Sequence, residues 1–481
     1  MNKIKEFLKE VNESISTNAY KGGSYALSLS ALVIAIIVVT NIAVSLLPSS
    51  LTRYDISSSK LYSITSNTKV VINALDEDVT IYWIVQADKE DSVIENLLER
   101  YDSLSDHISV VKKNPDIYPT FTSAYTNETV ANNSLIVESG SRYRYIAYDD
   151  IYLSDYDYTY YTTTYSFDGE GAITSAIDYV TAEELPKMYI LEGHGETQLS
   201  SAFSQQIEKE NIETESVSLL NIDMIPEDAD MLLIHSPSSD ISPEEKDILA
   251  DYVKNGGKIL IFAGSTEEGT LVNLYDLLAD YGVEAIEGVV IDPDRDHYAF
   301  QMEYILLPDI QSDEITDPLI DNRYYVIVPI AQGLQIDDDS GSTVTELLKT
   351  SSSSYSKIAG YQLTTYEKEE GDIEGPFTVG VSIETSSGGQ IICYASSDML
   401  DESFNAYSSG ANLDLTMNSI SSLIGEREAI SIRSKSLSYS YLTISDSDAS
   451  FIKTVMIILL PAVFVGLGIY MIVDRRKKHN G

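Results

Sequence analysis

The stretch Lys187-Met-Tyr-Ile-Leu-Glu-Gly-His-Gly-Glu196 decides the fold of this chain. A short apolar run that is followed at once by a glycine turn predicts a buried strand over Lys187 to Leu191. The spacing of Phe203 and Ile207 predicts that a helix comes next. Strand, turn and helix in this order begin a strand-helix-strand unit, which is typical of α/β proteins.

Two further strands follow at regular spacing. The apolar runs Met231-Leu-Leu-Ile-His235 and Lys258-Ile-Leu-Ile-Phe-Ala263 predict buried strands. Between them, Ser242-Pro-Glu-Glu245 is a capping box with proline at the first helical position, and the helix it opens is expected to stop at Gly256-Gly257. Strands that alternate with helices in this way predict a parallel sheet with helices on its faces.

The flanks of this unit predict additional parts. Gln390 to Ala395 predicts another strand, so residues from about 290 to 385 are expected to form an insertion or a second lobe. Toward the N-terminus, Val79 to Val85 alternates like a strand, and the apolar positions from Val93 to Tyr101 have helical spacing. The tyrosine and threonine tract from Asp155 to Tyr165 is interpreted as an aromatic strand or hairpin, with a sticky patch as the alternative.

Two long apolar runs, Tyr25 to Leu47 and Phe451 to Val473, predict transmembrane helices near the two ends of the chain. Each has 23 residues, enough at helical rise to cross a hydrocarbon core of about 30 Å. Basic residues mark the cytoplasmic side of a membrane segment. They precede the first run and follow the second: Lys3, Lys5, Lys9 and Lys21, then Arg475, Arg476, Lys477 and Lys478. Both termini are therefore expected inside the cell, with residues 48–450 outside.

The charge balance limits the classes of partner. The chain carries 75 acidic and 31 basic residues, a net charge of −44, so its surface should repel nucleic acid. Its single cysteine, Cys393, lies in an apolar run and is interpreted as a buried, inert thiol. Without a disulfide framework, the exterior of a bacterial plasma membrane fits better than a eukaryotic secretory product.

Several segments, in order along the chain, resemble the GldG-type family, auxiliary proteins of ABC transporters first associated with gliding motility. The central one is Asp178-Tyr-Val-Thr-Ala-Glu-Glu-Leu-Pro-Lys-Met-Tyr-Ile-Leu-Glu-Gly-His-Gly-Glu196. The segment from Tyr54 to Lys69 is similar to the family's entry segment after its first membrane helix. The segments Asn412 to Asn418, Leu423 to Glu426 and Ile432 to Lys435 are similar to its closing part, and Leu460-Pro461 with the basic tail also matches.

The resemblance implies a non-catalytic protein beside a separate permease and ATPase, with an exterior of amidotransferase-like or flavodoxin-like α/β domains. The expected order is a cytoplasmic N-terminus and a membrane helix, an N-terminal α/β lobe, an amidotransferase-like domain with the insertion, a membrane-proximal linker, a second membrane helix and a basic cytoplasmic tail. The expected bounds are 1–24, 25–47, 48–184, 185–431, 432–450, 451–473 and 474–481. The resemblance leaves the cargo open.

The turn Gly193-His194-Gly195-Glu196 is the sharpest candidate for a ligand or partner contact. It follows a predicted strand, where α/β sheets bind ligands, and the next helix start could hold an anion. His194 could act as a base that Glu196 orients. The alternative is that the glycines serve backbone geometry and that His194 bonds only to its neighbours.

Other kinds of chemistry find weaker support in the sequence. An amidotransferase needs a nucleophilic cysteine on a turn directly after a strand, but the turn His235-Ser-Pro-Ser-Ser239 contains no cysteine. Serine chemistry at Ser236 would need flanking glycines, which this turn also lacks. Asp292, Asp294 and Asp296 have the spacing of a calcium loop, although His297 replaces its glycine. Gly264 to Gly269 lacks the lysine of a phosphate loop. We therefore expect no metal and no cofactor, with the three aspartates as weak candidates.

Three functions remain at this stage. The leading one is a membrane-tethered auxiliary subunit of an ABC transport system that docks on a permease. The second is a surface-anchored, hydrolase-like enzyme of degenerate amidotransferase ancestry that acts through His194. The third is an acidic structural or adhesive surface protein.

Overall fold

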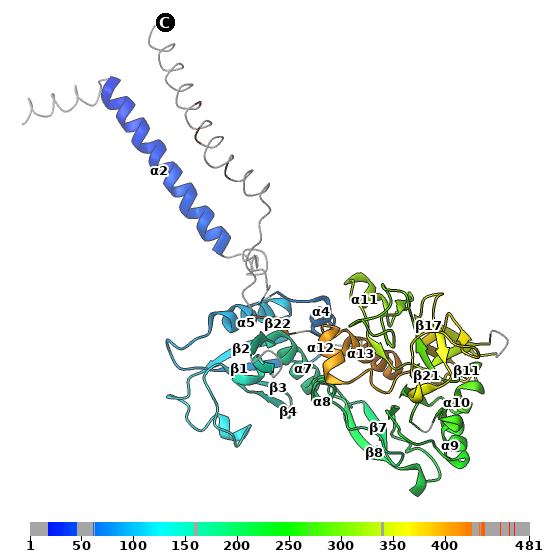
Figure 1. Cartoon of the computed structure of the whole chain (residues 1–481). Coiled ribbons are helices and arrows are strands. Elements are labelled where there is room, and N and C mark those ends of the chain that lie inside the picture. The colour runs from blue at the N-terminus through cyan, green and yellow to red at the C-terminus, as the bar shows by residue number, and fades with distance from the viewer. Residues whose placement is uncertain are drawn as a thin grey trace, which may run out of the picture. The chain divides into compact units, whose positions relative to one another are not determined.

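The fold is mixed α/β, as the sequence predicts, in a computed structural model of the chain (Figure 1). The structure describes residues 18–45, 61, 63–157, 162–267, 269–337, 341–425, 432, 434–437, 453, 461 and 466. The chain divides into two units, Met1–Ser154 with Ser166–Lys435, and Asp155–Tyr165 with Ser436–Gly481. The first unit holds both the N-terminal sheet and the large sheet that carries the His194 turn.

The N-terminal part of the first unit is built on a four-stranded sheet. Its strands lie in the order β2 (Ile108–Lys113), β1 (Val79–Ile84), β3 (Ser134–Ser139) and β4 (Arg142–Ile146), and only the β1–β2 pair is parallel. The predicted strand at Val79 and the predicted helix at Val93 are confirmed as β1 and α5 (Ser92–Leu104). Helices α4 (Ser66–Asn73), α6 (Tyr148–Ile151) and α7 (Gly169–Thr181) complete this part, and α7 packs on β3 and β4.

A ten-stranded sheet dominates the rest of the first unit. Its main order is β11 (Val283–Ile286), β16 (Gly333–Ile336), β20 (Thr378–Glu384), β21 (Gln390–Tyr394), β10 (Lys258–Phe262), β9 (Met231–His235), β7 (Lys187–Leu191) and β8 (Glu213–Val217). The strands from β21 to β8 are parallel, which confirms the predicted parallel sheet. The strands on the β20 side pair antiparallel.

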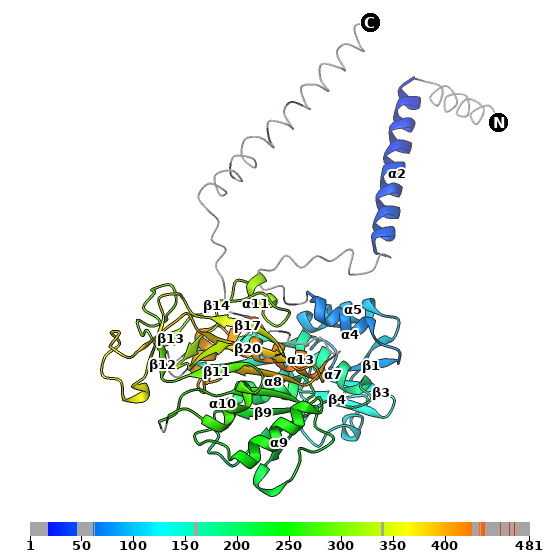
Figure 2. The ribbon, with the colours of Figure 1, turned by 90° about the vertical axis from the view of Figure 1, so that its right-hand side faces the viewer.

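Both faces of this sheet are buried, because successive side chains of a strand point to opposite faces. Along β10, Leu260 and Phe262 join one hydrophobic core, whereas Ile259 and Ile261 join the other. Side chains of α8 (Ser201–Lys209) and α13 (Ala411–Ile424) belong to the first core, and side chains of α9 (Pro243–Lys254) and α10 (Val272–Ala279) to the second. Figure 2 shows α9 and α10 together on one side of the sheet.

The stretch expected to be an insertion contributes to the large sheet itself. Besides β16 and β20 it supplies β17 (Thr343–Lys349), which pairs with β20, and β14 (Asp309–Ile310), which pairs with β17. Its other strands form two small sheets: β12 (Val289–Ile291) with β18 (Tyr355–Lys357) and β19 (Ile373–Glu374), and β13 (Ile305–Leu306) with β15 (Val328–Pro329). Helix α11 (Asp317–Asp321) lies within this stretch, and α12 (Glu402–Tyr407) follows it.

The tyrosine and threonine tract forms strands, as interpreted from the sequence. Strands β5 (Tyr152–Asp157) and β6 (Thr162–Phe167) join β22 (Lys435–Ser436) in a three-stranded sheet. In the second unit, the backbone N–H of Leu437 donates to the carbonyl oxygen of Tyr165 at 2.9 Å.

Helix α2 (Asn18–Ser45) contains most of the first predicted membrane run. Within the described part of the chain, no helix has the combined length and apolar character needed to cross a membrane. The second predicted run lies outside the described residues except for Lys453, Pro461 and Gly466. The two predicted transmembrane helices therefore stay predictions.

Candidate functional site

The His194 turn lies where the strand order of the large sheet reverses. From β7 the chain passes through α8 to β8 at one edge, and then crosses to β9 on the other side of β7. Helices α8 and α9 consequently cover opposite faces of the sheet. The loops that leave the carboxyl ends of β7 and β9 diverge at this point, which is the usual ligand-binding crevice of an open α/β sheet.

Glu196 shapes the turn from within. One of its carboxylate oxygens, Oε2, accepts hydrogen bonds from the backbone N–H groups of Gly193 (3.0 Å) and His194 (2.8 Å). The other, Oε1, lies 3.1 Å from Nδ1 of His194. Gly195 has φ +72°, a left-handed conformation that a glycine adopts without strain. Gly195 therefore serves the backbone geometry of the turn, which is the alternative to a role in ligand binding.

A second carboxylate holds the other side of the imidazole. Nε2 of His194 lies 3.1 Å from Oε2 of Glu245, and the same oxygen accepts the backbone N–H of Ser242 at 2.8 Å. Glu245 is the last residue of the predicted capping box, which the structure confirms at the start of α9. The side chains of His194, Glu196 and Glu245 are only 6%, 9% and 5% exposed. The cap of α9 is thus tied to the loop after β7.

The electrostatics favour a protonated imidazole between two carboxylates. The hydrogen bond to Glu196 raises the pKa of His194, and the bond to Glu245 adds to this against the opposing effect of burial. Burial acts to raise the pKa of Glu196, but the bonds from His194 and from backbone N–H groups outweigh it and lower the pKa. With both ring nitrogens engaged, His194 has no free lone pair with which to act as a base.

The loop after β9 is hydrogen-bonded to the turn after β7. The carbonyl oxygen of His194 accepts the backbone N–H groups of Ser238 and Ser239, each at 3.0 Å, and also their hydroxyl groups. The predicted contact residues Gly193, His194, Gly195 and Glu196 are therefore brought together with Glu245, but as an internal brace between two loops. Their role toward a ligand or partner stays a prediction.

Ser236 has the backbone conformation of a strained turn directly after a strand. Its φ is +53°, and its Oγ lies 3.3 Å from Nε2 of His235. The hydroxyl donates to the carbonyl oxygen of Ser397, the residue is buried, and burial lowers the pKa of His235. In this arrangement the hydroxyl hydrogen is directed to a carbonyl rather than to the histidine that a serine nucleophile needs as its base.

The aspartates of the weak metal candidate are engaged in a loop. The carboxylate of Asp292 accepts the backbone N–H of Ser351 at 2.8 Å and its hydroxyl at 2.7 Å, while Asp294 accepts the N–H of Asp296 at 3.1 Å. Among the described residues, no three His, Cys, Asp or Glu side chains are grouped so that they could hold a metal ion. Cys393 is buried in β21, as the sequence predicts, and burial raises the pKa of its thiol to about 12.

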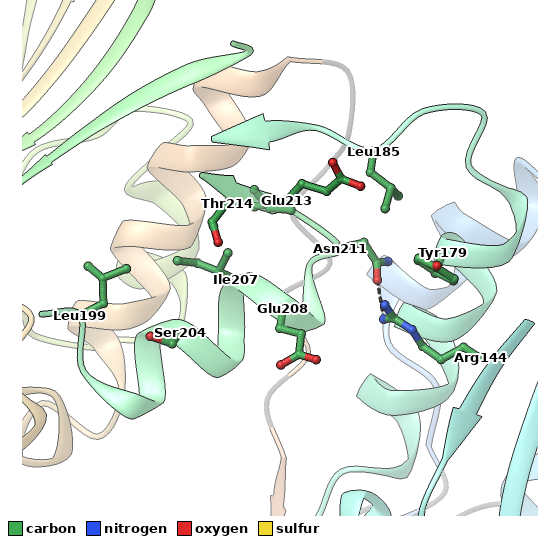
Figure 3. Close-up of a pocket in the computed structure, with 11 residues that line it drawn as sticks. Arg144, Tyr179, Leu185, Leu199, Ser204, Ile207, Glu208, Asn211, Glu213 and Thr214 are labelled. Atoms are coloured by element: carbon green, nitrogen blue, oxygen red, sulfur yellow. Dashed lines mark hydrogen bonds between the residues drawn. The ribbon is translucent and has the colours of Figure 1, made fainter. Parts of the chain in front are cut away.

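A cavity that the sequence analysis did not identify lies between the N-terminal sheet and the edge of the large sheet (Figure 3). Its volume is about 430 Å³, which is within the range of small-molecule sites. It is lined by residues of β4, α7, α8, β8 and the adjoining loops: Arg144, Tyr179, Leu185, Leu199, Ser204, Ile207, Glu208, Asn211, Ile212, Glu213 and Thr214. No motif unites these residues, since they come from separate elements of two lobes.

Asn211 joins the two lobes at this cavity. Its side-chain amide donates to the carbonyl oxygen of Ser175 and to the carboxylate of Asp178, both at 2.9 Å. Its Oδ1 accepts a hydrogen bond of 2.6 Å from the Arg144 guanidinium, which Figure 3 shows below it. Nearby, Nζ of Lys209 lies 2.5 Å from the buried carboxylate of Asp168. These contacts hold α7 of the N-terminal lobe against α8.

The fold and the closed His194 turn define an α/β protein with a doubly wound sheet and without an exposed catalytic constellation among the described residues. Residues 185–419 match the family model described as "ABC-type uncharacterized transport system". Residues 58–153 match a domain of unknown function. The first match, to residues 185–419, confirms the resemblance to ABC transporter auxiliary proteins.

Other comparisons give distant similarities only. No curated protein matches the chain. The mmIFT52 N-terminal domain is similar at 14% identity and a TM-score of 0.36, over 50% of this chain and 98% of that one. A putative GMP synthase protein from Thermoplasma acidophilum is similar at 12% identity and a TM-score of 0.29, over 50% and 96%. At these TM-scores, neither similarity defines the fold or the activity of this chain.

Proposed function

We propose that this protein is a membrane-anchored, non-catalytic auxiliary subunit of an ABC transport system that docks on a permease working with a separate ATPase. The family match over residues 185–419 carries the proposal, because it covers every strand of the large sheet. It associates the chain with ABC transport. The docking on a permease, the partner proteins and the cell membrane location go beyond this match and are proposed.

The state of the candidate catalytic groups supports a non-catalytic role. Both nitrogens of His194 are engaged by carboxylates, and Ser236 gives its hydroxyl hydrogen to a backbone carbonyl. The thiol of Cys393 is buried, and its raised pKa keeps it protonated near neutral pH. Energy for transport would then come from the ATPase.

An exposed apolar helix supports anchoring at the N-terminal end. In the described stretch of α2, large apolar side chains are exposed on all sides, with Ile34 at 61% and Val39 at 65%. Such a helix gains stability when lipid covers it. At the other end, Lys435 donates to the carbonyl oxygens of Leu61 and Ser63, at 3.3 and 2.8 Å. Lys435 therefore lies beside Leu61 and Ser63, which are far from it along the chain.

This arrangement is consistent with a two-pass protein of the bacterial plasma membrane. Both termini would be cytoplasmic, and residues 48–450 would lie outside. The strongly acidic exterior, within a net charge of −44, would stay clear of anionic lipid headgroups.

A pulldown of the tagged full-length protein from its native membrane in mild detergent, followed by mass spectrometry, tests this function. We expect an ABC permease and its ATPase to be recovered. A variant without residues 63–437 keeps both predicted anchors and reveals whether the exterior is needed for docking. Recovery of the full-length protein without either transporter component would overturn the proposal.

A further inference from the structure

The cavity between the lobes contains a guanidinium, that of Arg144, whose hydrogen-bond partners among the described residues are neutral. Arg144 of β4 is half-buried, and its Nη1 donates to Asn211 and, at 3.4 Å, to the hydroxyl of Ser175. The guanidinium carbon lies 4.1 Å from the centre of the Tyr179 ring. Within the described part of the chain, none of the ion pairs includes Arg144. These neutral contacts orient the guanidinium, and no carboxylate of the described residues is bound to it.

The chain as a whole is acidic, with 75 acidic and 31 basic residues. Burial lowers the pKa of Arg144, while Tyr179, Glu208 and Asp178 act in the opposite direction. A guanidinium that is partly removed from water and has no bound carboxylate can still accept a planar anion on its remaining N–H groups. The arginine end of the cavity therefore suits a carboxylate.

The rest of the cavity lining includes acidic and apolar side chains. Glu208 and Glu213 are exposed and present their carboxylates at its margin, as Figure 3 shows. These two charges oppose a ligand with several negative groups and favour one that also carries an ammonium group. Apolar side chains line the space as well: Leu185, Leu199, Ile207 and Ile212. The lining thus combines one cation, two carboxylates and an apolar wall.

We propose that this cavity binds a small zwitterion, a free amino acid or a short peptide with an apolar side chain. Its carboxylate would bind Arg144, its ammonium group would face Glu208 or Glu213, and its side chain would pack on the leucine and isoleucine wall. A cavity of about 430 Å³ has room for such a molecule. This proposal rests on the proposed function only where the ligand is interpreted as the cargo or a signal of the transport system. Binding of the ligand itself requires no permease.

The first test measures binding to the purified full-length protein in detergent by calorimetry and by thermal shift. The probes are L-leucine, trileucine, 4-methylpentanoate, which lacks the amine, and 3-methylbutylamine, which lacks the carboxylate. We expect leucine or trileucine to bind at least about tenfold more tightly than either singly charged analogue. The comparison of leucine with trileucine distinguishes an amino acid from a peptide. Absence of binding by both at about 10 mM would overturn the proposal.

Matched variants assign the binding to the cavity. Arg144→Gln keeps a side-chain donor for Asn211 but removes the positive charge, so we expect affinity to fall at least about tenfold. Arg142→Gln changes an exposed arginine on the same strand, which donates to the carbonyl oxygen of Glu183 at 3.0 Å, and should leave affinity unchanged. Glu208→Gln should lower the affinity for leucine more than the affinity for 4-methylpentanoate, which has no ammonium group. Equal affinities for the wild type and Arg144→Gln would overturn the site even if the pulldown recovers the transporter.

Discussion

At the scale of single residues, the charge of His194 links stability to pH. Its pKa is raised, first by Glu196 and then, against burial, by Glu245. A group whose pKa is higher in the folded state stabilises fully below its unfolded pKa, about 6.5, and loses this contribution as pH rises through the folded pKa. The lowered pKa values of Glu196 and Glu245 act oppositely, since their contribution is lost as pH falls through the folded values. We expect the free energy of unfolding, measured with urea, to be greatest between about pH 4.5 and about pH 6.5.

Replacement of His194 should remove the decline of the unfolding free energy above about pH 6.5. His194→Gln keeps a polar side chain but leaves two buried carboxylates without a cation, so we expect a loss of about 3 kcal/mol near pH 6. His107→Gln is the control, because His107 pairs with Asp78 at 3.0 Å on the surface. An unchanged decline of stability above pH 6.5 in His194→Gln would contradict the assignment of this decline to His194.

At the scale of elements, the first turn of α7 joins two segments that are far apart in the sequence, one at Thr65 and one at Lys435. The carboxylate of Glu170, 2% exposed, lies 2.8 Å from Nζ of Lys435 and also accepts the backbone N–H of Thr65 at 2.5 Å. Lys435→Met would leave this buried carboxylate uncompensated and remove the donor from Leu61 and Ser63. We expect a loss of about 3 kcal/mol of unfolding free energy, and faster proteolysis close to residues 61 and 435.

A double-mutant cycle isolates the contribution of this ion pair. Glu170→Gln combined with Lys435→Met removes both charges, so the double variant should be less destabilised than the sum of the single ones. Lys349→Met provides a surface control, because Lys349 and Glu346 are both about one-third exposed at 2.8 Å and should contribute at most about 1 kcal/mol. Additive effects of Glu170→Gln and Lys435→Met would show that the two residues act independently.

Elements with strong local patterns were predictable, and contacts between distant segments were not. The runs at Lys187 and Met231 became β7 and β9 with the predicted bounds, because continuous apolar runs suit strands that are buried on both faces. The capping box at Ser242 was likewise visible as a local motif. In contrast, Glu245 reaches His194 from 51 residues away, and Arg144 reaches Asn211 across 67. Such pairings depend on how the sheet is ordered, which no local pattern specifies.

At the scale of the whole molecule, the predicted topology places the acidic exterior on one side of the membrane and both basic ends on the other. The Lys435 contacts with Leu61 and Ser63 hold these two distant segments of the chain together. Labelling from each side of the membrane tests the predicted topology directly.

The native cysteine should not interfere with such labelling. Cys393 is fully buried, and its pKa of about 12 leaves almost no reactive thiolate near neutral pH, so an introduced cysteine can be measured without removing it. We expect Ser103→Cys, on the exposed side of α5, to react with a membrane-impermeant maleimide in intact cells. Lys5→Cys should react only after the membrane is opened, because positively charged flanks remain in the cytoplasm. Labelling of Lys5→Cys in intact cells, or protection of Ser103→Cys there, would reverse the proposed topology.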